Sequence, residues 1–305
     1  MDFVIGALAA SGAGFFTNPL DVLKTRMQLQ GELRARGQHA VHYRNVFHAA
    51  IVVVKNDGIL GLQKGLPAAV VMHGIRNCVR LGGYQWAHKR GYVTDEHGKT
   101  VFYKGFCVSA LTGAAGAFFG SPLFLIKTQM QSQSTKSVAV GYQHGRTGTL
   151  SAIKEIYTEH GIRGLWRGAG ATMLRAVAGS SAQLTSFAMT KDLLNDYHIF
   201  DNSPTLRTFS ASIVGGVFQA LAMQPFDLVS TRLYNQPVDE IGTGLLYKNI
   251  PDCFRKIWKT EGVFGFYKGL TAHYMRLGPH GALTLVFWDS LKDLQKTFQS
   301  KHQIS

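Results

Sequence analysis

Arginine side chains recur at helical spacing inside long segments that carry few other charges. Arg76 and Arg80 are four residues apart, and Arg175 and Arg276 lie in two further segments of the same kind. The planar guanidinium group donates two parallel hydrogen bonds, a geometry that matches carboxylate and sulfate groups. No acidic residue shares these positions. The pattern therefore predicts a binding site for a small anion.

A second chemically distinctive pattern, in which an acid and a base follow a proline, occurs at a fixed spacing. In its first copy Pro19 precedes Asp21 and Lys24, and the later copies begin at Pro122 and Pro225, 103 residues apart in both steps. Self-similarity at a fixed period indicates a chain built from copies of one structural unit. We expect three repeats, at 1–100, 101–203 and 204–305.

Each repeat must supply helices that position these side chains. Before each proline there is a run without Asp, Glu, Lys or Arg, long enough as a helix to cross about 30 Å of hydrocarbon; the runs are 3–20, 105–126 and 208–226. A loop with a short surface helix and then a second long helix follow, the latter at 65–91, 168–195 and 269–298. The sequence thus predicts an all-α membrane protein with six transmembrane helices in three pseudo-symmetric repeats.

Small residues precede each proline at every fourth position, which places them on one helix face where a neighbouring helix can approach closely. They are Gly6, Ala10 and Gly14, then Ser109, Gly113 and Ala117, then Ser212, Gly216 and Ala220. We also expect each proline to kink its helix.

Composition excludes several function classes. The net charge is +14, but the basic residues lie between neutral runs rather than on one face with interleaved aromatics, which argues against a nucleic-acid-binding protein. Cys78, Cys107 and Cys253 form no CxxC pair, so we expect three small core residues rather than a disulfide framework or a zinc site. No catalytic triad, carboxylate pair or P-loop is present, so the sequence predicts neither an enzyme nor a cofactor.

The threefold signature resembles that of the mitochondrial carrier family over essentially the whole chain. This resemblance implies six transmembrane helices around a threefold pseudo-symmetric cavity, in the mitochondrial inner membrane, with both termini on the intermembrane-space side. It also implies alternating access by a monomer. Short segments, among them 120–125 and Tyr234-Asn235-Gln236, are similar to the oxaloacetate carrier subgroup and its animal relatives, which are linked with dicarboxylates and sulfur oxoanions.

The resemblance implies a gate on the matrix side, in which the acid of one signature pairs with the base of the next. The pairs are Asp21 with Lys127, Asp227 with Lys24, and Phe124 with Ser230. The last pair has lost both charges together. Because a single stranded charge costs about 3–5 kcal/mol when buried, this double loss indicates compensation.

Two further sets of gate residues follow from the resemblance. Gln28 and Gln131 correspond to glutamines that brace the matrix gate, and Tyr234 takes the third such place. A cytosolic-side counterpart is complete only at Asp289 and Lys292.

The candidate substrate site lies on the second helices. Positions seven, eleven and fifteen residues past Gly65, Gly168 and Gly269 share one helix face. They form three layers, namely Met72, Arg175 and Arg276, then Arg76, Gly179 and His280, then Arg80, Gln183 and Thr284. The family's contact points fall mainly in the first layer, so we expect its two arginines to face water and clamp an anion while Met72 leaves the third side apolar.

The basic residue and the glycine that precede each second helix predict lipid contacts. Free amides at a helix start, beside a basic residue, make an anion site, and in this family such sites resemble cardiolipin clamps. The residues concerned are Lys64, Gly65, Arg167, Gly168, Lys268 and Gly269.

These expectations point to an antiporter that exchanges small carboxylates such as oxaloacetate, malonate or other dicarboxylates, and sulfate or thiosulfate. Two alternatives use the same fold: an uncoupling-type proton or anion leak, and a carrier of another small anion such as phosphate or phosphoenolpyruvate. The adenine nucleotide exchangers' mark, an arginine triplet followed by a methionine triplet, is absent from the sequence.

Overall fold

The computed structural model describes residues 2–34, 41–95, 101–197 and 203–304, and within these ranges the chain forms helices and no β-strand. This confirms the predicted all-α fold. Two of the helices, over Tyr103–Ser132 and Leu206–Asn235, are long and apolar enough to cross a membrane among the residues described.

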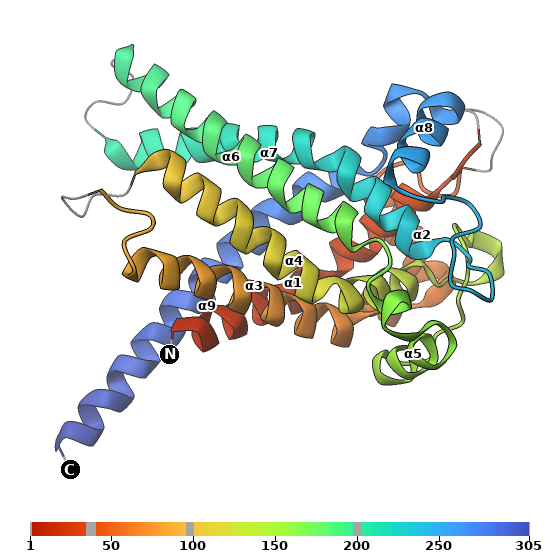
Figure 1. The fold of residues 1–305 in the computed structure, drawn as a ribbon, viewed down its shortest axis with the longest axis horizontal. Helices are drawn as coiled ribbons and strands as arrows, with labels where there is room; N and C mark the ends of the chain where they lie inside the picture. The colour runs from red at the N-terminus through yellow and green to blue at the C-terminus, as the bar shows by residue number, and fades with distance from the viewer. Residues whose placement is uncertain (1, 35–40, 96–100, 198–202, 305) are drawn as a thin grey trace.

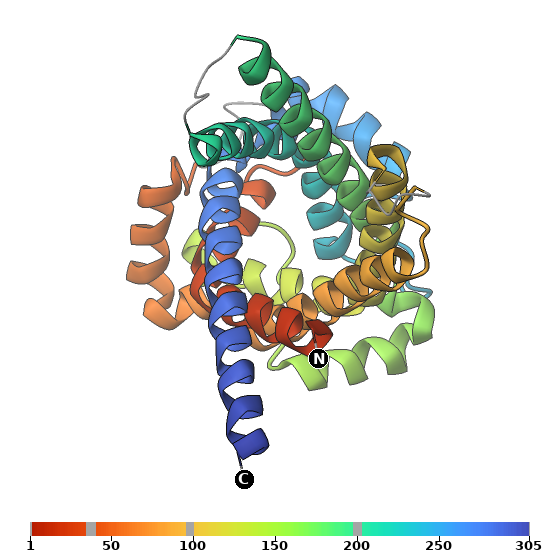
Figure 2. The same cartoon turned by 90° about the vertical axis from the view of Figure 1, so that its left-hand side faces the viewer.

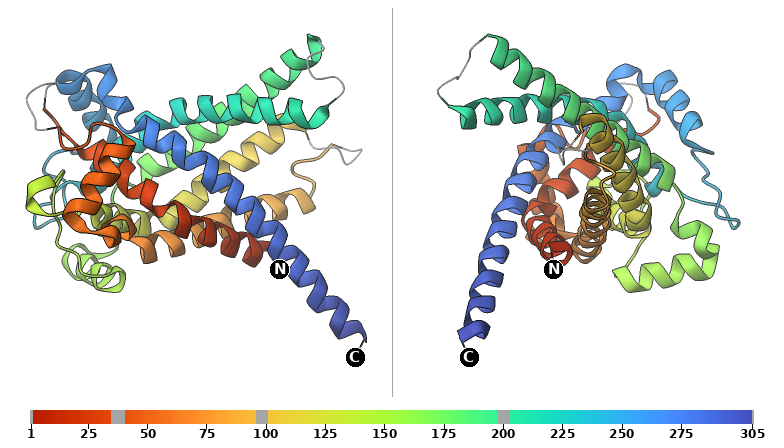
Figure 3. Two further views of the ribbon diagram at one scale, coloured as in Figure 1. Left: turned by 180° about the vertical axis from the view of Figure 1, so that it is seen from behind. Right: turned by 60° about the vertical axis from the view of Figure 1, so that its left-hand side comes forward.

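Six long helices account for most of the described chain and form a closed ring. They are α1 (Asp2–Leu29), α3 (Leu66–Lys89), α4 (Phe102–Ser132), α6 (Ala169–Asp196), α7 (Pro204–Asn235) and α9 (Leu270–Ile304). Each helix contacts the next in this order, and α9 closes the ring against α1. Figure 2 shows this ring from one end, and Figure 3 shows α9 crossing α1.

Three shorter helices gather at one end of the ring, opposite the ends of α1 and α9 that carry the termini (Figure 1). They are α2 (Val46–Asp57), α5 (Thr149–Leu165) and α8 (Ile250–Glu261). Asn45 and Asn249 cap two of them by accepting a backbone N–H in the first turn. The glycines at 58, 161 and 262 have φ between 62° and 73°, a left-handed value that ends each helical segment and favours glycine.

A small apolar core ties each short helix to the long helix that precedes it. The three cores pair Leu23 with Val53, Ile126 with Ile156, and Val229 with Ile257, among other buried residues. Burial of such side chains contributes roughly 1.5–3 kcal/mol each. These cores hold the second half of α1, α4 and α7, where the signatures lie, in fixed positions.

Two expectations about packing are wrong in part. A Cβ added to Gly6 would lie 2.8 Å from Leu81, as the small-residue stripe predicts, but one added to Gly113 or Gly216 would meet nothing within 4 Å. In α4 the close approach falls instead at Gly116, 2.7 Å from the Arg76 carbonyl, because α4 faces α3 at a different rotation. Among the cysteines, only Cys253 is a core residue, whereas Cys78 and Cys107 are exposed.

Candidate functional site

The carboxylate of Asp21 on α1 receives two cationic side chains from different helices. Lys127 Nζ of α4 lies 2.8 Å from one oxygen, and Arg276 Nε of α9 lies 2.9 Å from the other. All three side chains are buried. The signature acid of the first repeat thus joins three helices at one point.

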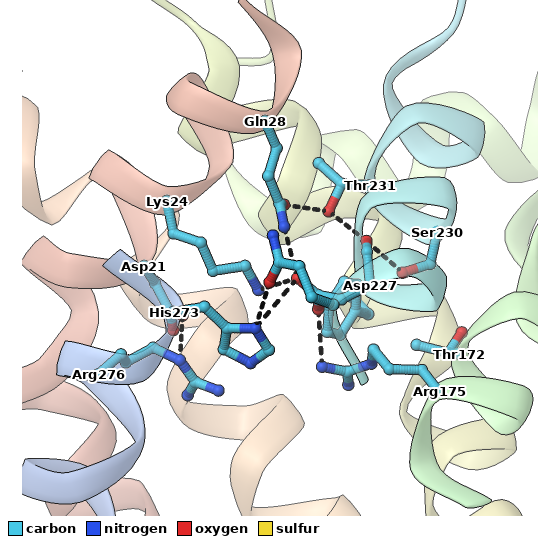
Figure 4. Close-up of polar contacts among 12 residues, drawn as sticks. Asp21, Lys24, Gln28, Thr172, Arg175, Asp227, Ser230, Thr231, His273 and Arg276 are labelled. Atoms are coloured by element: carbon cyan, nitrogen blue, oxygen red, sulfur yellow. Dashed lines mark hydrogen bonds and ion pairs between the residues drawn. The ribbon is translucent and has the colours of Figure 1, made fainter. Parts of the chain in front are cut away.

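Asp227 on α7 has an equivalent set of partners (Figure 4). Lys24 Nζ of α1 lies 2.7 Å from its Oδ2, and Arg175 Nη1 of α6 lies 3.0 Å from its Oδ1. Gln28 donates a hydrogen bond of 2.7 Å to the same carboxylate. His273, which the sequence analysis did not single out, lies 4.0 Å from it and is held by Gln224 at 2.6 Å.

These two groups carry more positive than negative charge. Two carboxylates face two lysines and two arginines, which leaves a formal excess of two positive charges. Taking such ions out of water costs several kcal/mol each, and only their close contacts offset that cost. The excess charge makes the centre of the ring attractive to an anion.

The third symmetry-related position is apolar. In each charged group an acid meets the base of the following repeat and the arginine of the preceding one, and the same rule assigns Ser230 and Met72 to Phe124. Phe124 and Met72 belong to one buried apolar cluster. The Ser230 hydroxyl donates to the carbonyl of Asp227 on its own helix, at 2.9 Å. All three members of this group have therefore lost their charge together.

Phe124 also touches the two charged groups on either side. The guanidinium carbon of Arg175 lies 4.9 Å from the centre of its ring, and Lys127 Nζ lies 5.4 Å from it. At these distances the ring face attracts a cation by about 0.5–2 kcal/mol. The aromatic ring is thus a second neighbour for two cations that already pair with Asp227 and Asp21.

The predicted bracing residues differ in what they contact. Gln28 spans from Asp227 to Thr231, whose hydroxyl donates to it at 2.9 Å. Gln131 on α4 instead forms hydrogen bonds with Thr25 and Asn18 on α1, so it supports the contact between these two helices rather than an acid–base pair. The Tyr234 hydroxyl bonds Ser121 and Thr172.

The expectation that Arg175 and Arg276 face water is wrong for this conformation. The two residues are 3% and 5% exposed, and each forms an ion pair with a gate acid. Met72, also predicted in this layer, is 1% exposed. The separate sets that the sequence assigns to the substrate and to the gate are therefore one contiguous network.

The outer layers are more open. Arg76 is half-buried, whereas Arg80 and Gln183 are exposed. Neither arginine forms an ion pair with any residue in the described ranges. His280 accepts or donates a hydrogen bond with Thr17 at 3.1 Å and lies 4.8 Å, ring to ring, from His73.

Only part of the cytosolic-side set lies in the described structure. The side chain of Asp289 is outside the described residues. Lys292 Nζ lies 4.8 Å above the ring of Trp288.

Two of the predicted lipid residues, Lys64 and Lys268, contact other parts of the protein. Lys64 donates to the carbonyl of Gln133 at 3.0 Å, and Lys268 Nζ lies 2.6 Å from Glu261. Both side chains stay partly exposed, so these internal contacts leave the predicted lipid role untested. The glycines at 65, 168 and 269 do precede α3, α6 and α9, and each has a φ between 72° and 81°.

An outer ring of ion pairs was missed by the sequence analysis. Arg26 binds Asp57 at 2.6 Å, and Arg232 binds Glu261. Burial alone would raise the pKa of Asp57, but hydrogen bonds from Arg26 and from the Thr135 amide lower it below its ordinary value. The signal was available, because each of these arginines lies two residues after the signature position that Lys24 holds in the first repeat and Ser230 in the third.

A closed ring of long helices, built from three repeats and holding two groups of ion pairs and one apolar group at its centre, is the architecture of a membrane carrier. The family model described as "Mitochondrial carrier protein" matches residues 1–93, 98–198 and 201–299. The chain belongs to the mitochondrial carrier family, and it is accordingly a transporter of the mitochondrial inner membrane rather than an enzyme.

Curated relatives match along almost the whole chain. "Solute carrier family 25 member 35" of Homo sapiens is 47% identical, covering 97% of this chain and 99% of that protein. The "Mitochondrial oxaloacetate transport protein" of Saccharomyces cerevisiae is 38% identical over 98% of this chain and 91% of its own length. The "Mitochondrial citrate transporter E" of Aspergillus niger is 36% identical over 98% and 94%.

Proposed function

We propose that this carrier exchanges small dicarboxylates, such as oxaloacetate or malonate, and sulfate or thiosulfate, by alternating access. Two observations support the anionic substrate: the formal excess of two positive charges at the centre of the ring, and relatives named for oxaloacetate and citrate. A dianion would balance that excess.

The observation that carries the proposal is that Arg175 and Arg276 each bind a gate carboxylate. The chain's own Asp227 and Asp21 thus take the place that substrate carboxylates would occupy. An entering dianion would bridge the two arginines and release both acids. Of its two cationic partners each acid would then keep only the lysine, which weakens the closed gate and couples binding to opening.

The apolar third position would set the shape of the substrate. Met72 and Phe124 offer no donor to a third anionic group. A substrate with two acidic groups fits two arginines and one apolar wall, whereas a third carboxylate would be buried without a partner. Arg76 and Arg80 would draw anions inward from the open side, and Gln183 would hydrogen-bond a keto or hydroxyl oxygen.

The membrane arrangement is part of the same proposal. The repeats divide at 1–100, 101–203 and 204–305, both termini face the intermembrane space, and α2, α5 and α8 face the matrix. The carrier works as a monomer, with cardiolipin held by the free amides at the starts of α3, α6 and α9. Protease accessibility of terminal tags in intact mitoplasts and mitochondria tests this orientation, and termini on opposite sides would contradict it.

Reconstituted liposomes test the transport mode. We expect uptake of labelled malonate only when the liposomes contain a counter-substrate, because the closed network reopens when a dianion displaces its acids. Equal uptake into empty liposomes, or collapse of a pH gradient without any substrate, would favour the uncoupling-type leak instead. Phosphate and phosphoenolpyruvate serve as competing substrates in the same assay.

A further inference from the structure

The outer ring of ion pairs has the same construction in the first and third repeats. Asp57 binds Arg26 and lies 3.7 Å from Lys64, while Glu261 binds Arg232 and Lys268. Each carboxylate also accepts a backbone N–H from the next segment, that of Thr135 or Leu33. In both repeats a buried carboxylate therefore joins an arginine to the basic residue before the second helix.

The second repeat has lost this carboxylate. A Cβ added to Gly61, Gly164 or Gly265 would lie 2.5–2.6 Å from the Cβ of Asp57, His160 or Glu261 respectively, so His160 occupies the position of the acid. Its neighbour Glu159 has a side chain that is 56% exposed.

The arginine of this link is missing from the second repeat as well. Gln129 takes its place and donates to the Tyr234 carbonyl at 3.2 Å. Arg167, which takes the place of Lys64 and Lys268, makes no ion pair with any described residue. Its buried Nε has no hydrogen-bond partner there either.

A cavity of about 530 Å³ lies where the missing acid–arginine link would be. Arg167, Arg146, Gln129 and His144 line it. Arg146 donates to the Gln129 amide oxygen at 3.3 Å and also binds Glu155. Burial lowers the pKa of Arg167 to about 10, with Arg146 adding to the shift, so this guanidinium stays protonated at neutral pH. Burial also lowers the pKa of His144 to about 4, which leaves that ring neutral.

We propose that this cavity binds a small monocarboxylate, whose carboxyl group takes the place that Asp57 and Glu261 fill in the other repeats. The ligand accepts hydrogen bonds from Arg167 and Arg146 and completes the third link of the outer ring. The molecule supplies the precedent for this chemistry twice, in buried carboxylates that bind a pair of basic residues.

Acidic residues around the cavity restrict the charge of the ligand. Glu159, Asp239 and Glu240 also line it. Asp239 is already engaged, because its carboxylate accepts the backbone N–H groups of Ile241 and Thr243. All three carboxylates would repel a second negative charge on the ligand, Glu159 and Glu240 from exposed positions. The cavity should therefore prefer a monoanion, whereas the excess positive charge of the central network suits a dianion.

Thermal unfolding of the purified full-length carrier with acetate or butyrate, against chloride at equal ionic strength, tests the proposal. At about tenfold excess over Kd we expect a rise in Tm of roughly 2–4 °C. Arg167→Gln should abolish this rise. His160→Glu supplies the carboxylate within the chain, so it should raise Tm without ligand and abolish the response to acetate.

Two control variants make the outcome specific. His160→Gln supplies no carboxylate and should retain the acetate response, and Arg276→Gln disables the central site while leaving this cavity intact. No acetate response in the native chain, or a response that persists in both His160→Glu and Arg167→Gln, would overturn the proposal. A response lost in Arg276→Gln but kept in His160→Glu would place the anion at the centre of the ring and would likewise overturn it.

Discussion

The two charged groups and the apolar group at the centre of the ring occupy equivalent positions but are stabilised differently. Asp21 and Asp227 each hold a lysine and an arginine from two other helices. The third position holds Phe124 beside Met72. Of the three equivalent positions at the centre of the ring, two are therefore charged and one is apolar.

The difference shows that the acid, the lysine and the arginine of one position change together, and not the acid and lysine alone. Loss of the acid alone would strand a lysine and an arginine, and loss of both bases would strand the carboxylate. Replacing all three leaves no unpaired charge. It also makes the site asymmetric, because a bound anion meets cations on two sides and an apolar wall on the third.

Removing one gate acid should have the largest effect on stability. Asp227→Asn leaves Lys24 and Arg175 buried with no anion, which should cost about 3–5 kcal/mol and lower Tm by about 6 °C or more. Ser230→Ala, at the apolar position, removes only a hydroxyl bonded to its own helix and should change Tm by about 2 °C or less. Thermal unfolding of both variants measures this, and equal stabilities would contradict the difference between the groups.

Restoring charge at the apolar position should have an intermediate effect. Phe124→Asp alone should impair transport, and adding Ser230→Lys should recover part of it, because the new acid and base would pair. We expect a coupling of about 0.5–3 kcal/mol in a double-mutant cycle of stability, and Met72→Arg should add to it. Additive effects of the Asp and Lys changes would mean that the two positions do not meet.

Lowering the pH, which acts on the ion pairs of the outer ring, should have the smallest effect on stability. The folded-state pKa of Asp57 is lowered, so its contribution to stability is present above its unfolded pKa of about 4 and is lost as pH falls through the folded value. Glu261 behaves alike, since its pKa is also lowered, despite burial, mainly by hydrogen bonds from Arg232. Asp57→Asn should therefore flatten the fall of Tm below about pH 4. An unchanged pH profile would contradict the assignment.

The repeat made much of the fold predictable from sequence, and the family resemblance that it carries made the acid–base pairing predictable. The contacts of Lys127 with Asp21 and of Lys24 with Asp227 are the ones that this resemblance implied for the three signatures. The contact between Arg276 and Asp21 did not follow, because it depends on how α9 is rotated against α1. Spacing along one helix fixes which residues share a face, but not which residue of another helix that face meets.

The second repeat shows a different limit. The end of its short helix contains both Glu159 and His160, so an acid is visible in the sequence even though its side chain does not reach the ion-pair position. Only the packing of Gly164 against His160 fixes the register. A one-residue shift decides whether the outer ring holds three links or two.

Transport by variants of the first layer tests the central claim most directly, namely that Arg175 and Arg276 receive the substrate. Labelled malonate exchange is measured in liposomes for Arg175→Gln, Arg276→Gln and the matched Met72→Leu, with Tm confirming that each is folded. Because Lys24 and Lys127 still hold the acids, the arginine variants should fold yet lose about 100-fold or more of the exchange rate. Met72→Leu, a volume-conserving change, should stay within a few-fold of the native rate. Near-native exchange by both folded arginine variants would contradict the account.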